Sequence, residues 1–326
     1  MRSFQKVLVT GGAGFIGSEL VSLLLREGFE VIAVDDLSKG ERSRLPKENG
    51  KFSFVLADLR ERGKALEVIR ECDWVMHLAS QAYGIAYCSR SHSNTFLLNG
   101  QINANVIEAV QTNGVPGMVA VSSSCVYSDD APDCMTEDMG FQGEPESANW
   151  GYGWAKRMLE VGVMAAVRDR RFEGVIVRPV NIYGASYGWF GEDSHVIPSL
   201  ARKLLSGENP IVVWGDGNQA RSFVHVRDTA QALLELSLKA PNGTVVNLGD
   251  EKAISINELV ETMGNLFDVK PQVKHDLTKP VGRKVKSVSS KKFRNILPDF
   301  QWKVPIRGGL NEMKNWYERH KSLSTF

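Results

Sequence analysis

Short apolar runs alternate with longer segments of helical periodicity over the first half of the chain. The runs are rich in Val, Ile, Leu and Phe and too short for helices, so they predict buried strands. Between several of them, apolar residues recur at helical spacing, which predicts helices with one buried face. The predicted strands are 7–10, 31–34, 52–56, 73–79, 118–122 and 174–179, and the predicted helices follow residue 17 and span 94–110 and 152–168. This alternation implies a parallel, doubly wound α/β sheet of the Rossmann type.

The regular alternation of short apolar runs and helical segments ends at residue 179. Residues 181–191 are rich in Gly, Tyr and Trp, a composition suited to a loop that faces a ligand. Further helices are predicted at 196–205, 229–238, 255–267 (capped by Ser255) and 310–320, and further strands at 211–213 and 244–248. We expect a Rossmann domain of residues 1–180 plus about 211–250, interleaved with a smaller substrate-binding α/β lobe of about 181–210 plus 251–326.

The composition argues against several classes of partner. Of the 326 residues 43% are hydrophobic and the formal net charge is +1, so neither nucleic acid nor a membrane surface is favoured. The apolar runs are far shorter than a membrane span and a strand begins close to the first residue, so a cytoplasmic protein is expected. Cys72, Cys88, Cys125 and Cys134 form no C-x-x-C pair, which predicts neither a disulfide framework nor a metal site.

Glycines stand where the first strand gives way to the first helix. Gly12, Gly14 and Gly17 have the G-x-G-x-x-G spacing, and Gly11 adds a fourth residue that tolerates a sharp turn. A pyrophosphate can approach such a bare backbone and accept hydrogen bonds at the helix N-terminus. A glycine-rich surface turn has the same pattern, but Asp35 follows about 20 residues later at the end of the second strand. An Asp there binds the adenosine ribose hydroxyls and repels a 2′-phosphate, so NAD is predicted rather than NADP.

The predicted NAD site extends along the ends of the neighbouring strands. Asp58 and Leu59 close the third strand, where an adenine ring would lie. His77, inside the fourth strand, is predicted to be a packed residue rather than a catalyst. The expected cofactor-binding residues are Gly11, Gly14, Phe15, Ile16, Gly17, Asp35, Asp58, Leu59, Leu78, Tyr152 and Lys156.

Tyr152 and Lys156 are one helical turn apart, which puts a phenol and an ammonium on one face of a helix. The cation is expected to lower the pKa of the phenol toward neutrality and make Tyr152 a general base. A helical surface pair is the alternative. Ser123 follows the fifth strand, at the edge where sites form in parallel sheets.

These features together resemble the extended short-chain dehydrogenase/reductases that act on nucleotide sugars. The resemblance covers nearly the whole chain and includes the segment 178–184. It implies that Tyr152 is the base at the sugar hydroxyl being oxidised, that Ser123 is its hydrogen-bonding partner and that Lys156 holds the nicotinamide ribose. Family analogy also implies a homodimer built on the helices that begin near residues 94 and 152.

The same resemblance implies substrate contacts. Asn181 and Arg221 match residues that contact the substrate diphosphate, a ligand that the planar fork of Arg suits. Near Arg283 the chain departs from the family pattern, so a phosphate contact from Arg283 or Lys286 and solvated charge remain alternatives. The expected substrate-binding residues are Gly84, His92, Ser123, Asn181, Arg221 and Arg283.

Two features narrow the resemblance within the family. Cys125 and His195 resemble the acid/base pair of GDP-fucose synthases, which use NADPH. The blocks 84–93, 214–223 and 246–249 are more similar to GDP-mannose 3,5-epimerases. Those enzymes have a lysine in place of His195, but they use NAD, in agreement with Asp35.

The Cys125 and His195 pair suits chemistry beside a ketone. Oxidation of a hexose at C4 acidifies C3 and C5, because the carbanion formed at either is stabilised as an enolate. A base on one face of the ring and an acid on the other then invert those carbons. A thiol and an imidazole both titrate near physiological pH and can do this work. The alternative is that Cys125 is a small hydrophobe and His195 a helix N-terminal residue.

The sequence therefore predicts an NAD-dependent nucleotide-sugar epimerase that works through a transient 4-keto sugar and inverts C3, C5 or both, with a GDP-hexose as favoured substrate. A UDP-hexose 4-epimerase and a GDP-4-keto-6-deoxyhexose epimerase/reductase are the alternatives within the fold. A 4,6-dehydratase is disfavoured, because Ser124 and Cys125 stand where such enzymes carry an Asp-Glu pair. A non-catalytic NAD-binding sensor is the alternative from another class, and intact Ser123, Tyr152 and Lys156 argue against it.

Overall fold

Seven parallel strands form the central sheet of the computed structural model, which describes residues 2–186, 189, 194–279 and 281–320. In spatial order they are β12 (Thr244–Leu248), β7 (Glu173–Pro179), β5 (Gly117–Val121), β4 (Trp74–His77), β1 (Lys6–Thr10), β2 (Glu30–Asp35) and β3 (Phe52–Leu56). All neighbouring strands pair in parallel. The prediction of a doubly wound α/β fold is confirmed.

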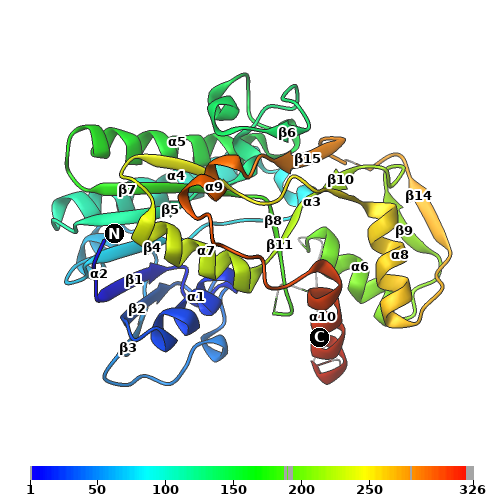
Figure 1. Cartoon of the computed structure of the whole chain (residues 1–326), viewed down its shortest axis with the longest axis horizontal. Helices are drawn as coiled ribbons and strands as arrows, with labels where there is room; N and C mark the ends of the chain where they lie inside the picture. The colour runs from blue at the N-terminus through cyan, green and yellow to red at the C-terminus, as the bar shows by residue number, and fades with distance from the viewer. Residues whose placement is uncertain (1, 187–188, 190–193, 280, 321–326) are drawn as a thin grey trace.

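Helices cover both faces of this sheet (Figure 1). One face carries α4 (His92–Thr112) and α5 (Trp150–Arg168), with α2 (Arg62–Val68) against α4, and the other carries α1 (Phe15–Arg26) and α7 (Val226–Lys239). Along β1, Val7 and Val9 join the core with α1, whereas Leu8 joins the core with α4. Because both faces are buried, the strands are apolar throughout, which is why continuous apolar runs predicted them.

A smaller lobe lies on the right of Figure 1. It contains α6 (Val196–Leu205), α8 (Ile256–Phe267), α10 (Ile306–His320) and the parallel pair β9 (Ile211–Trp214) and β14 (Val273–Asp276). Leu200, Leu259 and Met313 are buried together in its core. Ser255 caps α8 as predicted, in a capping box with Glu258.

The predicted boundary between the two parts is wrong at two places. β9 pairs with β14 in the smaller lobe, although residues from 211 onward were expected in the Rossmann domain, where α7 and β12 do lie. α9 (Lys291–Ile296), expected in the smaller lobe, returns to the large domain, because Phe293 is buried in the core that α1 and α7 share. Apolar periodicity predicts a buried face but does not specify which core that face joins.

Several short elements have no pattern long enough to predict them. They are α3 (Ile85–Cys88), β6 (Cys134–Met135), β8 (Asn181–Tyr183), β10 (Ala220–Arg221), β11 (Phe223–His225), β13 (Ile254–Ser255), β15 (Val285–Val288) and the single-turn helices η1 (Arg42–Arg44), η2 (Ser124–Val126), η3 (Glu137–Phe141) and η4 (Ser147–Asn149). β8 occupies the start of the expected loop 181–191, of which residues 187–188 and 190–191 lie outside the described residues. β10 pairs with β15 so that Arg221 stands level with Lys286, which brings two distant cations side by side.

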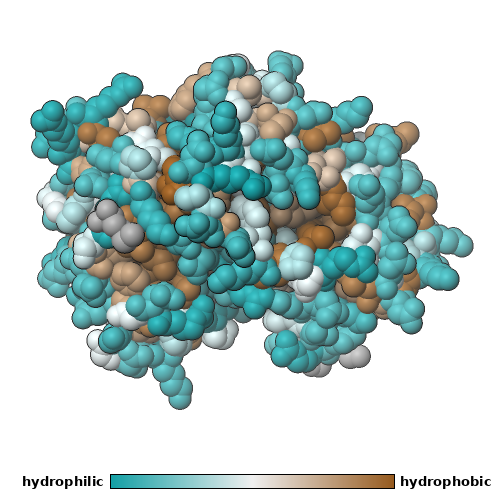
Figure 2. Space-filling model, in the orientation of Figure 1, coloured by the Kyte–Doolittle hydropathy of each residue, from teal (hydrophilic) through white to brown (hydrophobic). Residues whose placement is uncertain are grey.

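Figure 2 shows that this face of the molecule is mostly polar, with apolar atoms visible where the two parts meet. None of the helices in the described ranges combines the length and the apolar character needed to cross a membrane.

Candidate active site

A cavity of about 1080 Å³ lies between the large domain and the smaller lobe. It runs along the carboxyl ends of β1, β2, β4 and β5, where binding sites form in open parallel sheets. Its walls include every predicted cofactor-binding residue and the five predicted catalytic residues, Ser123, Cys125, Tyr152, Lys156 and His195. Segments that are far apart in the sequence therefore converge on one site.

The glycine turn between β1 and α1 is shaped by contacts that exclude side chains. Gly11 has a φ of +68°, and a Cβ added to it would lie 2.8 Å from the backbone nitrogen of Ala79. A Cβ added at Gly17 would lie 2.0 Å from the Gly11 carbonyl oxygen. Gly14 is the N-cap of α1 and lines the cavity. A pyrophosphate fits this cradle, because bare backbone and helix N–H groups face it.

The Asp35 carboxylate is held at the end of β2 by the surrounding backbone. It accepts hydrogen bonds from the N–H groups of Ala13 (3.0 Å) and Leu37 (2.8 Å). Burial raises the pKa of Asp35 above its ordinary value, although these hydrogen bonds act in the opposite direction. The remaining lone pairs can accept ribose hydroxyls, whereas a 2′-phosphate here would meet a carboxylate. The residues present therefore fit NAD.

Two loops that line the cavity are joined by side chains, and we name Ser38, Lys39, Gln81 and Tyr83 the loop latch. The Gln81 amide donates a hydrogen bond to the Ser38 hydroxyl (3.0 Å), and the Tyr83 hydroxyl donates one to Gln81 Oε1 (3.0 Å). The Lys39 ammonium lies 3.2 Å from the centre of the Tyr83 ring. The latch connects the loop after β2 to the loop after β4, beside the NAD-binding residues.

Tyr152, Lys156 and Ser123 converge, but their electrostatics differ from the prediction. The Lys156 ammonium lies 5.5 Å from the centre of the Tyr152 ring and donates to the Val121 carbonyl oxygen (2.9 Å). Burial raises the pKa of Tyr152 above its ordinary value and lowers the pKa of Lys156 to about 8. The predicted fall of the phenol pKa is therefore wrong, because exclusion of water outweighs the hydrogen bonds with the Ser80 and Ser123 hydroxyls.

Cys125 and His195 line the same cavity from different elements. Cys125 lies in η2 directly after β5, and its N–H donates to the Ser123 hydroxyl (3.1 Å). His195 is the N-cap residue of α6. Burial raises the pKa of the Cys125 thiol and lowers the pKa of His195 to about 4. The prediction that both titrate near neutral pH is wrong, and the neutral thiol and neutral imidazole are the stable forms at pH 7.

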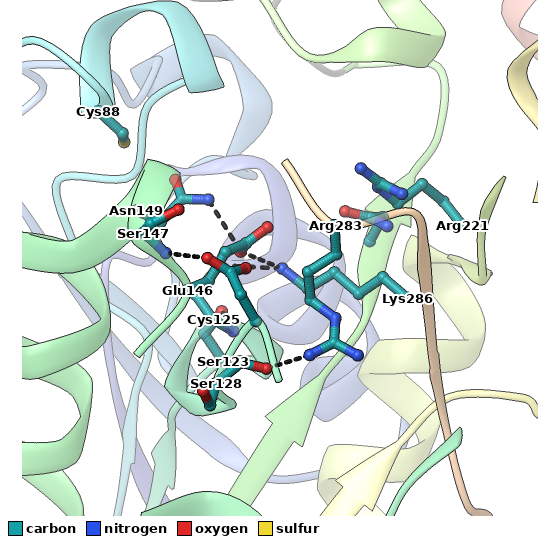
Figure 3. Close-up of polar contacts among 12 residues, drawn as sticks. Cys88, Ser123, Cys125, Ser128, Glu146, Ser147, Asn149, Arg221, Arg283 and Lys286 are labelled. Carbon is teal, nitrogen blue, oxygen red and sulfur yellow. Dashed lines mark hydrogen bonds and ion pairs between the residues drawn. The ribbon is translucent and has the colours of Figure 1, made fainter. Parts of the chain in front are cut away.

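A buried ion pair flanks Cys125 (Figure 3). The Lys286 ammonium lies 3.3 Å from Cys125 Sγ and 2.6 Å from Glu146 Oε2, to which Asn149 also donates a hydrogen bond (3.0 Å). Lys286 and Glu146 are 4% and 2% exposed, so their charges face each other with little water between them. Sequence reasoning missed Glu146, and for Lys286 it considered a phosphate contact or solvated charge, neither of which is an ion pair with a buried carboxylate. The sequence signal that could have pointed to an unusual role for Lys286 was the departure from the family pattern near Arg283.

The residues predicted to bind the substrate divide into two groups. Ser123, Asn181 and Arg221 line the cavity. Arg283 is outside the cavity lining, and its guanidinium donates to the carbonyl oxygens of residues 128, 131 and 132, with the contact to Ser128 visible in Figure 3. The expected phosphate contact from Arg283 is therefore not supported, because these carbonyl groups hold its guanidinium away from the cavity.

His92 and Gly84 also lie outside the cavity lining. The His92 ring stands edge-on to Trp150 and its Nδ1 accepts the N–H of Gly151 (3.5 Å), at the start of α5. Gly84 is the N-cap of α3, next in sequence to Tyr83, which does line the cavity. Both residues are therefore outside the lining of this cavity, although residues on both sides of Gly84 belong to it, and their contact with the sugar stays a prediction.

Comparisons with known proteins agree with this site. Residues 7–249 match the sequence profile of the NAD dependent epimerase/dehydratase family. A dTDP-4-dehydro-6-deoxy-D-allose reductase from a Streptomyces species is 31% identical over 97% of each chain. GDP-L-fucose synthase 1 of Arabidopsis thaliana is 28% identical over 96% of this chain and 93% of its own. GDP-mannose 3,5-epimerase 1 of Oryza sativa subsp. indica is 29% identical over 83% of this chain and 71% of its own.

A solved structure gives the same picture of the fold. The UDP-glucose 4-epimerase of Thermus thermophilus, in complex with NAD, is 25% identical, covers 96% of this chain and 99% of its own, and superposes with a TM-score of 0.84. The names of these proteins include epimerases, a synthase and a reductase, so a common fold carries several reactions on nucleotide sugars.

Proposed function

Because the chain belongs to the NAD dependent epimerase/dehydratase family, we propose that it is a nucleotide-sugar epimerase that works through a transient 4-keto sugar. We propose that it inverts C3, C5 or both in a GDP-hexose and acts as a cytoplasmic homodimer. The observation that carries the proposal is that Cys125 and His195 line one cavity together with Ser123, Tyr152 and Lys156. A 4-epimerase needs no such pair, since its keto sugar has only to turn over before it is reduced.

The first step is proton transfer from the C4 hydroxyl of the sugar. Tyr152 is the base for this proton, Ser123 hydrogen-bonds to the same oxygen, and the Lys156 ammonium stabilises the phenolate. NAD, when bound, supplies the hydride-accepting and hydride-returning chemistry at C4. Since burial holds the pKa of Tyr152 above its ordinary value, only a small fraction of the free protein has the phenolate ready at neutral pH.

Protonation states assign the two roles beside the ketone. His195, with a pKa of about 4, is a neutral imidazole and accepts the proton of the C–H bond. The electron pair of that bond moves onto the C4 oxygen to give an enolate, and returns to carbon when the Cys125 thiol donates its proton from the other face. The pair is then an imidazolium and a thiolate, the states that an inversion in the opposite direction needs. Inversion of a second carbon, with the thiolate as base and the imidazolium as acid, therefore returns both groups to their neutral forms.

An epimerase/reductase acting on a GDP-4-keto-6-deoxyhexose is the second candidate. The Cys125 and His195 pair serves that reaction equally well, and relatives named as a fucose synthase and an allose reductase favour it. Such a reaction consumes one reduced cofactor per product, whereas the proposed epimerase leaves its cofactor unchanged. Asp35 disfavours NADPH, the cofactor expected for a synthase of that kind.

Incubation with GDP-, UDP- and dTDP-hexoses in D₂O, followed by mass spectrometry and proton NMR of the recovered sugars, tests the proposal. We expect deuterium at C3 or C5 with no net change in absorbance at 340 nm. Inversion at C4 without solvent deuterium would identify a 4-epimerase. Consumption of NADH in proportion to a 4-keto-6-deoxy substrate would identify the epimerase/reductase, and no product from any sugar would favour a sensor.

A further inference from the structure

Charged groups from several elements surround the Cys125 thiol. In the described part of the chain, the groups that act on it include the cations Lys156 on α5, Arg221 on β10 and Lys286 on β15, the anion Glu146 from the loop before η4, and the phenol of Tyr152 on α5. Among these groups the cations outnumber the single anion. Such a field favours the thiolate over the thiol, in opposition to burial.

Lys286 stands out among these cations because it contacts the sulfur. Its ammonium lies 3.3 Å from Cys125 Sγ, within hydrogen-bonding distance for sulfur, and the lysine is 4% exposed. Electrostatic interactions are stronger where water is excluded, so a charge that develops on this sulfur interacts strongly with the ammonium. Glu146 fixes the position of this ammonium (Figure 3). Its Oε2 lies 2.6 Å from Lys286 Nζ and also accepts a hydrogen bond from Asn149.

We propose that Lys286 is a positioning residue for the acid/base step at Cys125, whose thiolate it stabilises, and that Glu146 holds Lys286 in place for this purpose. This inference rests on the proposed function, in which Cys125 protonates an enolate. In that step the S–H bond breaks and a C–H bond forms, and negative charge passes from the enolate oxygen to the sulfur beside the ammonium. The thiolate regains a proton when it acts as the base in the reverse inversion.

The ionisation of Cys125 can be measured without any sugar. The rate of alkylation by iodoacetamide is followed against pH and assigned to Cys125 by peptide mass spectrometry, in a Cys134→Ser background because Cys134 is exposed. Lys286→Met is expected to raise the pH at which half of Cys125 is reactive by about one to three pH units. Lys286→Arg, which keeps the charge, is expected to restore most of the reactivity.

Lys284→Met is the matched control, since Lys284 is exposed and two residues from Lys286. It removes the same charge from the surface and is expected to leave the alkylation profile unchanged. A folded Lys286→Met protein with the alkylation profile of the control would overturn the inference. An ion pair with only a structural role would not change the ionisation of the Cys125 thiol.

Glu146→Gln supplies a second test with the opposite sign. It removes the negative charge that competes with the thiolate for Lys286, while the amide oxygen of Gln can still accept the hydrogen bond that keeps the ammonium in place, so the half-reactive pH of Cys125 is expected to fall. If Lys286→Met does not fold, this variant decides, and an unchanged or raised half-reactive pH rejects the inference. Alkylation and solvent deuterium exchange are separate readouts. A protein that epimerises no sugar but shows the alkylation shifts retains the Lys286–Cys125 coupling and loses only the proposed function.

Discussion

Burial determines the protonation states of the candidate catalytic side chains. It raises the pKa of Tyr152, lowers the pKa of Lys156 to about 8, and lowers the pKa of His195 to about 4. Burial thus disfavours the charged forms of these three side chains, and each charge that the reaction creates on them needs a fixed partner. We propose Lys156, whose ammonium lies 5.5 Å from the centre of the Tyr152 ring, as that partner for the phenolate, and Lys286, 3.3 Å from Cys125 Sγ, as that partner for the thiolate.

The pH profile of kcat/KM follows from these states. Below pH 8 the phenolate of Tyr152 is scarce, because its pKa lies above the ordinary value, so activity is expected to rise with pH. Above about pH 8 Lys156 loses its proton and no longer stabilises the phenolate, so the profile is expected to turn down. Lys156→Arg keeps its charge and is expected to move this turn to higher pH. The same turn in both proteins would assign it to another group.

Single substitutions of the acid/base pair are expected to differ in isotope exchange. Cys125→Ser and His195→Gln should each slow inversion by about 10²–10⁴-fold. In D₂O, Cys125→Ser should still place deuterium in the unchanged sugar, because His195 removes a proton and returns one on the same face. His195→Gln should place none. Proton NMR of recovered substrate measures both, and near wild-type inversion by Cys125→Ser would remove Cys125 from the mechanism.

The parts of this site that the sequence predicts are those fixed locally. Tyr152 and Lys156 meet because one helical turn separates them, and the glycine turn is a continuous segment. Glu146 and Lys286 are 140 residues apart, and their contact depends on how β15 pairs with β10 and on a loop before α5. The protonation states were mispredicted for a related reason, since burial comes from the whole fold.

Whether the sequence predicts a secondary-structure element depends on the length of that element. Strands of the main sheet and long helices carry their own apolar pattern and were predicted, whereas β6, β10 and β13 are two residues long and exist only through distant partners.

The junction of β1, β4 and α4 is held by His77. Its Nδ1 is hydrogen-bonded to the Thr10 hydroxyl (2.7 Å) and its Nε2 to Asn103 Oδ1 (3.1 Å), so the prediction of a packed histidine is confirmed.

His77 makes the stability of this junction depend on pH. Burial lowers its pKa to about 3, while the unfolded chain has the ordinary value of about 6.5, so between these values only the unfolded state binds the proton. Stability is therefore expected to fall as pH falls below 6.5. Between pH 7 and 5, His77→Gln should lose about 2 kcal/mol less unfolding free energy than the wild type. Urea denaturation at both pH values measures this, and equal losses would contradict it.

The loop latch is expected to slow release of the cofactor. A partly exposed cation–π contact such as Lys39 over Tyr83 contributes about 0.5–1 kcal/mol, so Lys39→Met and Tyr83→Ala should each speed NADH dissociation about two- to fivefold. The fluorescence of bound NADH follows this rate. Because the two residues share the cation–π contact, the effect of the double variant should be smaller than the product of the two single effects. Multiplicative effects would show that the contact does not restrain the cofactor.

At the scale of the whole molecule, the site lies between the two parts and a separate apolar surface lies on the large domain. The large domain contributes the NAD cradle, Tyr152 and Cys125, and the smaller lobe contributes His195 at the start of α6. On the outer sides of α4 and α5, Leu97, Met158 and Val161 are 59%, 48% and 56% exposed. Large apolar side chains gathered on neighbouring helices are typical of a protein interface.

This surface coincides with the helices expected to form a homodimer, so a charge placed on it should prevent association. Val161→Asp is expected to turn a dimer into a monomer in sedimentation equilibrium, because the dimer would have to bury an unpaired carboxylate. Leu277→Asp is the matched control, since Leu277 is 75% exposed but follows β14 in the smaller lobe. Helical content should be unchanged in both variants, since neither side chain is buried in the monomer. A wild-type monomer, or a dimer that Leu277→Asp splits and Val161→Asp does not, would move the interface away from α4 and α5.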